Sequence, residues 1–258
     1  MPSWAACRTA LDSVLYKHAG SHPAYMQQLS TCTAGVLAGK PCLQHLELTE
    51  CSMLDAAGTA ELMYYIEQLQ ELTHLNFSNS LKCGRVWVYP NPPAAAYSAL
   101  TASSKLQHLD ISGCTVPAGV WQKLFSPNKQ LPHLRALHIS GVRSGSAAAP
   151  DGSLLTSCCP GLQLLDMRDM RYSAEQLSPL AELSGLHELQ LHPAGGSLSS
   201  PEGLEVVRQL TGLRRLTLWD PSEDAMLLQV CPWGVIGGVA GGGGGVHWCH
   251  RLSTRACR

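Results

Sequence analysis

The chain has 258 residues and a formal net charge of -1, with 45% of its residues hydrophobic and only 14% charged. This composition supports a sizeable core in one large domain or two small ones, and it excludes a protein whose overall charge attracts nucleic acid or acidic membranes. The clustered basic residues of nucleic-acid binders are also missing from the sequence, so we expect no nucleic-acid partner.

Cysteine usage and the first residues of the chain both bear on the compartment. There are eleven cysteines, an odd number, and the N-terminal residues lack the basic-then-apolar layout of a secretory signal. A reducing compartment with unpaired thiols is then the default. We expect a cytoplasmic protein, and an association with the cytoskeleton or a cilium stays open.

Residues 1–40 are expected to form a helical cap ahead of the main part of the chain. Apolar residues have helical spacing over 11–18, and a second helix is indicated over 25–29. A degenerate structural repeat would give a similar pattern, and the sequence leaves both interpretations open.

A leucine pattern recurs seven times between residues 41 and 221. Each copy reads Leu, two residues, Leu, one residue and an apolar residue, and the copies begin at Leu43, Leu72, Leu106, Leu134, Leu162, Leu186 and Leu213. The alternation at the end of each copy predicts a short strand that turns one side inward and the other outward. One such unit cannot bury its own apolar side, so we expect the units to stack and their strands to form a parallel sheet.

The pattern resembles the Leu-x-x-Leu-x-Leu-x-x-(Asn/Cys) signature of the leucine-rich repeat superfamily, with Cys51 and Cys114 at the final, ladder position. Cys42 and Cys159 precede repeat starts, as in the cysteine-containing type of F-box proteins. Other copies depart from the signature and carry Ser80, Val142, Met170, Ala194 and Pro221 at the ladder position. The resemblance implies an α/β fold, a ribonuclease-inhibitor-like solenoid or horseshoe with a concave parallel β-sheet and convex helices or turns.

The segments between the predicted strands contain helix signals. Residues 54–69 have helical spacing, Ser173 begins a capping box, and Pro201 stands at a first helical position. An insertion near 81–104 carries Trp87 and several prolines that oppose a helix. Trp87 either contacts a partner from an exposed loop or packs on the flank of the repeats.

Residues 222–258 are glycine-rich, and we expect a disordered tail there. The uncharged stretch 225–246 contains Pro232 and a glycine run, so it falls short of the about 20 strongly apolar residues of a membrane span. The tail also holds the metal-capable residues Cys231, His247, Cys249 and His250, but they lack the paired cysteine spacing of a zinc site, and we expect no metal.

The sequence contains no nucleophile elbow, phosphate loop or zinc-protease motif. We therefore expect no enzymatic activity, no cofactor and no small-molecule substrate. The resemblance implies instead a scaffold for protein–protein interaction that binds a partner protein on its concave sheet. A substrate-recognition fragment of a ubiquitin ligase of the F-box type, or a regulator of an enzyme or GTPase, is the alternative.

The expected binding residues are those that point outward from the seven strands. They are His45, Glu47, His74, Asn76, His108, Asp110, His138, Asp166, Arg168, Gln190, His192, Arg215 and Trp219. Because adjacent strands lie about 4.8 Å apart, His45, His74 and His108 should form a ladder. Such a ladder is either a pH-sensitive or metal-loading patch or a set of polar surface residues duplicated with the repeat.

The two ends of this predicted face differ in character. Its first half is rich in histidine and acidic residues, whereas the last part carries Arg168, His192, Arg215 and Trp219. Arginine and tryptophan are enriched in interface hot spots, so we expect the C-terminal end to anchor the partner. A Trp219 that only covers the core of the last repeat is the alternative.

Overall fold

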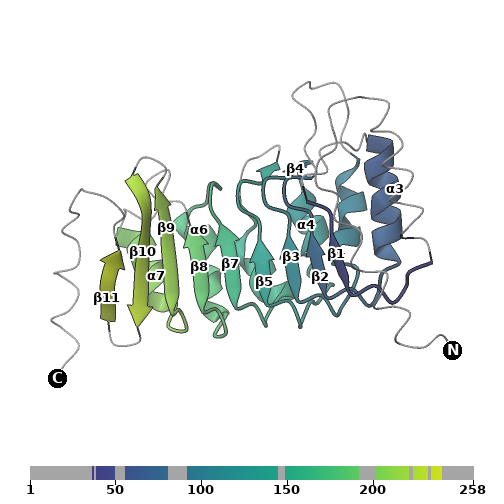
Figure 1. Cartoon of the computed structure of the whole chain (residues 1–258). Helices are drawn as coiled ribbons and strands as arrows, with labels where there is room; N and C mark the ends of the chain where they lie inside the picture. The colour runs from purple at the N-terminus through teal and green to yellow at the C-terminus, as the bar shows by residue number, and fades with distance from the viewer. Residues whose placement is uncertain are drawn as a thin grey trace.

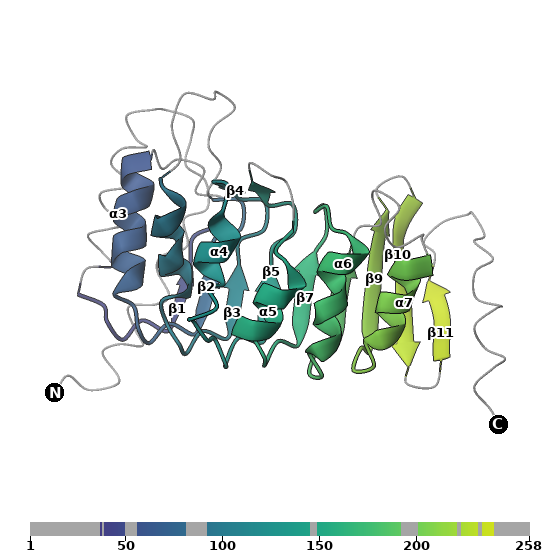
Figure 2. The ribbon, with the colours of Figure 1, turned by 180° about the vertical axis from the view of Figure 1, so that it is seen from behind.

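The computed structural model describes residues 37, 39–49, 56–80, 92–144, 149–191, 201–220, 223–231 and 234–239. Within these ranges the chain is an α/β protein in which helices cover one face of a single large sheet (Figures 1 and 2). Of the residues expected to form an N-terminal helical cap, nearly all lie outside the described ranges.

Seven parallel strands lie side by side in chain order. They are β1 (His45–Glu47), β2 (His74–Asn76), β3 (His108–Asp110), β5 (Ala136–His138), β7 (Leu164–Met167), β8 (Glu188–Leu191) and β9 (Arg215–Asp220). These are the strands that the leucine pattern predicts, and the parallel sheet is confirmed.

The register of the sheet aligns the second leucine of every copy. Leu46, Leu75, Leu109, Leu137, Leu165, Leu189 and Leu216 are paired across neighbouring strands, and each is at most 6% exposed. A shift of one residue in any strand would turn its leucine away from the core, so burial of this column fixes the register. The residues on either side of each leucine consequently face the opposite side of the sheet.

Four turns after the strands repeat one backbone conformation. Asn79, Gly113, Gly141 and Asp169 each stand four positions after the central leucine and have φ angles of 59°, 67°, 62° and 58°. This left-handed region favours glycine and tolerates asparagine and aspartate, which are the residues found here. The repeated conformation lets the backbone N–H groups of Asn79, Gly113 and Gly141 reach carbonyls of the next unit at 2.7–2.8 Å.

The residue after each left-handed turn is buried at the ladder position. The Ser80 hydroxyl donates to the carbonyl oxygen of Leu48, and the Cys114 thiol donates to that of Phe77 at 3.1 Å. Leu48 and Phe77 occupy equivalent places in successive units. A small donor at this position therefore adds a side-chain hydrogen bond to a backbone carbonyl of the preceding strand segment.

The connections between strands carry helices on one side of the sheet (Figure 2). They are α3 (Ala56–Glu67), the 3-10 helix η1 (Ala94–Thr101), α4 (Val120–Leu124), α5 (Gly152–Cys158), α6 (Ala174–Leu177), the 3-10 helix η2 (Ser178–Glu182) and α7 (Pro201–Gln209). Two short strands, β4 (Thr115–Val116) and β6 (Arg143–Ser144), form a separate parallel pair. The core lies between the sheet and these helices.

Several of the helix signals in the sequence are confirmed. The capping box of α6 forms, with the Ser173 hydroxyl accepting from the Gln176 backbone and the Gln176 side chain accepting from the Ser173 backbone. Helix α7 begins at Pro201, as expected for a first helical position. The expected helix over 54–69 is found as the shorter α3.

The insertion near 81–104 differs from the expectation that its prolines oppose a helix. Its described part contains η1, which follows Pro93 and buries Tyr97 to 1% exposure. The prolines precede the helix, where a missing N–H costs nothing, so they start it and do not break it. Trp87 lies outside the described residues.

The sheet also continues into the segment expected to be a disordered tail. Strands β10 (Glu223–Cys231) and β11 (Gly234–Val239) add to β9 in antiparallel order. The apolar run over 225–231 suits a strand next to an open sheet edge, and residues 240–258 of the predicted tail lie outside the described residues. In the described ranges, no helix has both the length and the apolar character needed to cross a membrane.

Candidate functional site

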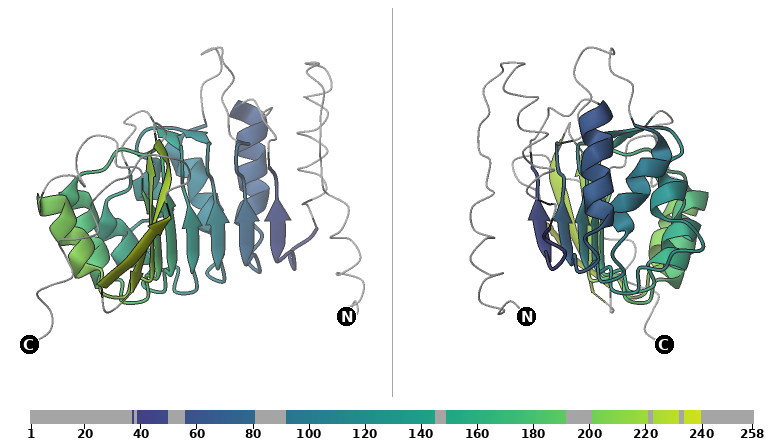
Figure 3. Two further views of the ribbon diagram at one scale, coloured as in Figure 1. Left: turned by 60° about the vertical axis from the view of Figure 1, so that its left-hand side comes forward. Right: turned by 90° about the vertical axis from the view of Figure 1, so that its right-hand side faces the viewer.

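Figure 3 shows the sheet with the helices on one side of it. The side chains that alternate with the buried leucines belong to the opposite face. We call it the open face. The expected binding residues that β1 to β9 place on it are His45, Glu47, His74, Asn76, His108, Asp110, His138, Asp166, Gln190 and Arg215. Arg168 follows directly after β7, His192 lies outside the described residues, and of Trp219 only the backbone in β9 is described.

Four imidazole rings form a continuous row across β1, β2, β3 and β5. The ring centroids are 5.3 Å apart for His45 and His74, and 5.8 Å apart for His74 and His108, with both pairs stacked. His138 continues the row at 5.1 Å from His108. We call these four residues the histidine row.

The fourth member of this row was assigned to a different column by the sequence pattern. His138 stands two residues after the strict register partner of His108, which is Ala136. The methyl group of Ala136 leaves room, so the ring of His138 leans across to His108. The absence of a large side chain at position 136 is the signal that could have revealed this contact.

Hydrogen bonds orient the rings at the N-terminal end of the row. His45 Nε2 lies 3.0 Å from Glu47 Oε1, and His74 Nδ1 lies 3.0 Å from Thr73 Oγ1. The Thr73 hydroxyl donates its hydrogen to the carbonyl oxygen of Gln44 at 2.9 Å. Since a hydroxyl has one hydrogen, His74 Nδ1 must donate to Thr73, and neutral His74 then has its lone pair on Nε2.

Burial and mutual repulsion make the middle of the row harder to protonate. The pKa of His74 is lowered by burial and then by His45, with Glu47 opposing the shift. The pKa of His108 is lowered by burial and then by His138, with Asp110 opposing and His74 and His45 adding to the shift. Both rings therefore favour the uncharged form at neutral pH.

Asp166 is the centre of a compact ion-pair network. Its carboxylate accepts from Arg168 Nε at 2.9 Å and Arg168 Nη2 at 2.8 Å, and His138 Nδ1 lies 3.6 Å from Oδ2. Burial by itself raises the pKa of Asp166, but His138 and Arg168 outweigh it and lower the pKa to about 2. The hydrogen bond to Asp166 also raises the pKa of Arg168.

A second carboxylate network joins β8 and β9. Glu188 Oε2 accepts from Arg215 Nη1 at 2.8 Å, and Glu188 Oε1 accepts from Gln190 Nε2 at 2.8 Å. Glu188 was not among the expected binding residues. Its place beside Arg215 in the sheet register is the signal that identifies it.

These pairs change the expected charge distribution of the open face. Arg168 and Arg215 each face a carboxylate of their own sheet, so they do not form an unopposed basic end. At the N-terminal end of the sheet, Asp110 accepts from the backbone N–H of Ser112 at 2.8 Å, and the ion-pair partner of Glu47 is His45. Arg168 also interacts electrostatically with Asp110, whereas an unprotonated His45 would leave Glu47 without a charged partner among the contacts described.

Three open-face residues also stabilise the ends of their strands. Asn76, Asp110 and Asp166 each accept from the backbone N–H two residues ahead, at 2.9, 2.8 and 3.1 Å. Such local turns close a strand without any ligand. Part of the recurrence of Asn and Asp at this position is therefore structural.

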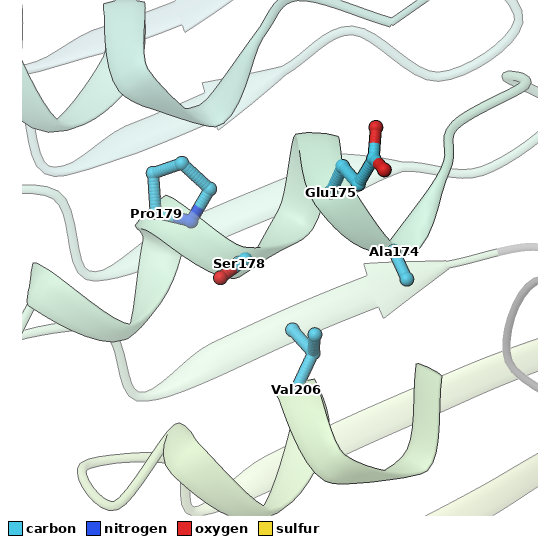
Figure 4. A pocket seen from close by; sticks show the side chains of 5 residues that line it. All are labelled: Ala174, Glu175, Ser178, Pro179 and Val206. Atoms are coloured by element: carbon cyan, nitrogen blue, oxygen red, sulfur yellow. The ribbon is translucent and has the colours of Figure 1, made fainter. Parts of the chain in front are cut away.

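The helix side has a surface depression of its own. A shallow depression of about 370 Å³ lies between α6 and α7, lined by Ala174, Glu175, Ser178, Pro179 and Val206 (Figure 4). Glu175 is its single ionisable residue, and its open shape suits no enclosed ligand.

Cysteines and metal-binding side chains do not form a site in the described part of the chain. Cys158 and Cys159 are buried thiols, and burial raises the pKa of both, which disfavours the reactive thiolate. No group of three or more histidine, cysteine, aspartate or glutamate side chains within the described ranges has the arrangement to hold a metal ion.

Comparison with protein-family models finds no match to this chain, and comparison with curated proteins finds none either. The repeated sequence pattern and the geometry of the open face are therefore the observations that bear on function.

Proposed function

We propose that the chain is an interaction module of the leucine-rich repeat type that binds a partner protein on its open face. The seven copies of the leucine pattern support the repeat assignment, and so do the equivalent donors at Ser80 and Cys114 and the recurring left-handed turns. In a stack of this kind each unit contacts its neighbours, and the sheet provides one extended binding surface.

The observation that carries the proposal is a polar sheet face that the described helices leave uncovered (Figures 1 and 3). Seven strands at about 4.8 Å spacing present a strip about 30 Å long, which is the scale of a standard protein interface. Histidine, carboxylate, amide and guanidinium groups alternate along it. A long, polar and shallow surface fits a macromolecule better than it fits a small ligand.

A capture experiment with paired variants tests this proposal. The full chain is immobilised, and the proteins it retains from lysate are quantified by mass spectrometry. An open-face variant, Glu47→Lys with Asn76→Lys, is compared with a helix-side variant, Lys123→Glu with Arg208→Glu. Both pairs are accessible to solvent and lie in regular elements on opposite sides of the molecule.

We expect a protein that the native chain retains to be lost from the open-face variant and kept by the helix-side variant. Reversing or adding charge within a protein interface opposes its electrostatic complementarity, whereas a change outside the interface does not. Loss from the helix-side variant alone, or equal retention by both, would place the binding surface elsewhere.

A further inference from the structure

We propose that the histidine row, together with Glu47 and Asp110, docks an arginine-bearing segment of the partner protein and releases it when the histidines take up protons. The inference rests on the proposed function, because it names the partner chemistry of that same face. It also adds a condition under which binding ends.

Hydrogen-bond acceptors dominate this part of the open face at neutral pH. The Thr73 hydroxyl fixes His74 Nδ1 as a donor, so the lone pair of neutral His74 is on Nε2. No hydrogen bond within the described residues reaches this Nε2 atom. The carboxylates of Glu47 and Asp110 flank the ring on the neighbouring column of the sheet.

This arrangement complements an arginine side chain. A guanidinium has five N–H donors, no acceptor and a permanent positive charge, and it forks readily onto carboxylates. The two carboxylates supply the opposite charge, while the neutral ring supplies an acceptor. The rings are stacked on one another, so their faces are largely occupied and the contact is made through ring edges.

Protonation of the histidines would change both the hydrogen-bond acceptors and the charge of this part of the open face. Each imidazole that gains a proton loses its acceptor and gains a positive charge, so it repels a guanidinium. The charged and titratable groups that face the row come from five neighbouring strand units. They are His45 and Glu47 of β1, His74 of β2, His108 and Asp110 of β3, His138 of β5, and Asp166 with Arg168 at β7.

The balance of these groups favours an acidic face at neutral pH and the loss of that negative charge in acid. Arg168 pairs with Asp166 and also interacts electrostatically with Asp110, so its one positive charge faces two carboxylates, and Glu47 adds a third negative charge. Lowered pKa values keep His74 and His108 uncharged at neutral pH. Protonation of His74 and His108 would add two positive charges, which offset the charge of the two carboxylates in acid.

Fluorescence anisotropy with the full chain tests the proposal. The probe is a labelled peptide with four arginines separated by glycine and serine, and matched peptides carry lysine or glutamate in place of arginine. We expect the arginine peptide to bind most tightly at about pH 7.5 and about tenfold more weakly at about pH 5.5. Preference for the glutamate peptide at neutral pH, equal affinity for the lysine peptide, or an affinity independent of pH would overturn the proposal.

Two sets of variants separate the contribution of the histidine acceptors to binding from that of the carboxylate charges. His74→Gln with His108→Gln keeps a side-chain acceptor without a titratable group, so binding at pH 7.5 should persist and its pH dependence should shrink. The matched control His133→Gln changes an exposed histidine outside the row and should keep the full pH dependence. Glu47→Gln with Asp110→Asn, which preserves the acceptor for the Ser112 backbone, should weaken binding at pH 7.5 about tenfold.

The outcomes also separate this inference from the proposed function. If the arginine peptide fails to bind while the capture experiment still loses its partner through open-face changes, the face binds a partner of different chemistry. In that case the docking proposal falls and the proposed function stands. If neither the peptide nor any captured protein depends on the open face, both are wrong.

Discussion

Asp166 is only 1% exposed although it lies on the open face, because Arg168 and His138 cover its carboxylate. A buried charge is tolerated when its partners satisfy it, and removing one member leaves the other poorly paired. We expect Asp166→Asn to lower the free energy of unfolding by about 2 kcal/mol near neutral pH, as measured by urea denaturation.

An exposed ion pair provides the control for this change. In α7, Arg208 Nη1 lies 3.4 Å from Glu205 Oε2, and both side chains are largely accessible to solvent. Because solvent screens such a pair, Glu205→Gln should change the free energy of unfolding by less than about 0.5 kcal/mol. If the two substitutions changed the free energy of unfolding equally, the contacts of Asp166 with Arg168 and His138 would not stabilise the protein as described.

The same carboxylate predicts a dependence of stability on pH. The pKa of Asp166 falls from 3.8 to about 2 on folding, so its contribution is fully present above 3.8 and is lost as the pH falls toward 2. The difference in unfolding free energy between the native chain and Asp166→Asn should therefore shrink by about 2 kcal/mol across this range. Urea midpoints of both proteins at a series of pH values measure it, and a difference that stays constant would contradict the assignment.

Glycines before the first leucine of several copies set how closely neighbouring elements approach. A Cβ atom on Gly161 would lie 2.6 Å from the carbonyl oxygen of Pro132, whereas one on Gly185 would lie 3.5 Å from that of Leu162. The first distance requires the backbone to move, and the second is an ordinary contact. Gly161 therefore has a steric reason to be glycine that Gly185 lacks.

We expect Gly161→Ala to lower the free energy of unfolding by about 2 kcal/mol through overpacking. Gly185→Ala should be neutral or stabilise by up to about 1 kcal/mol, since it restricts the unfolded chain without a clash. Thermal and urea denaturation of the two variants measure the contrast. Similar effects at both positions would contradict the close approach at Gly161.

Among the helices and strands, the sequence predicts best those whose structure follows from residues close together in the chain. The leucine alternation places the strands and their register, and Ser173 with Gln176 gives the start of α6. The predicted ladder of His45, His74 and His108 forms because register follows from the buried leucines. Local chemistry and burial act in the same direction at these positions.

Features that depend on neighbouring units could not be predicted in the same way. The contact of His138 with His108 requires the small Ala136 beside it, and the burial of Asp166 requires Arg168 to fold back. The ion pairs of Arg168 and Arg215 with carboxylates of their own sheet likewise depend on neighbouring strands. Whether the expected residues bind a partner stays a prediction.

At the scale of the whole sheet, the chain order of the parallel strands means that each described inner strand is stabilised by the strands on either side. One side of the sheet packs its leucines against the helices to form the core, and the other side, the open face, carries the polar groups. The ends of such a sheet are its weakness, because an edge strand presents unpaired backbone groups. At the C-terminal end, β10 and β11 extend the sheet beyond β9.

This arrangement predicts how shortened chains behave. A chain that ends at Asp220 loses β10 and β11 and exposes the edge of β9, so we expect it to self-associate through strand pairing. A chain that ends at Val239 keeps both strands and should match the full chain. Size-exclusion chromatography with light scattering, over a range of protein concentrations, gives the mass of each. A chain ending at Asp220 that stays monomeric and folded would mean that β10 is not what protects this edge.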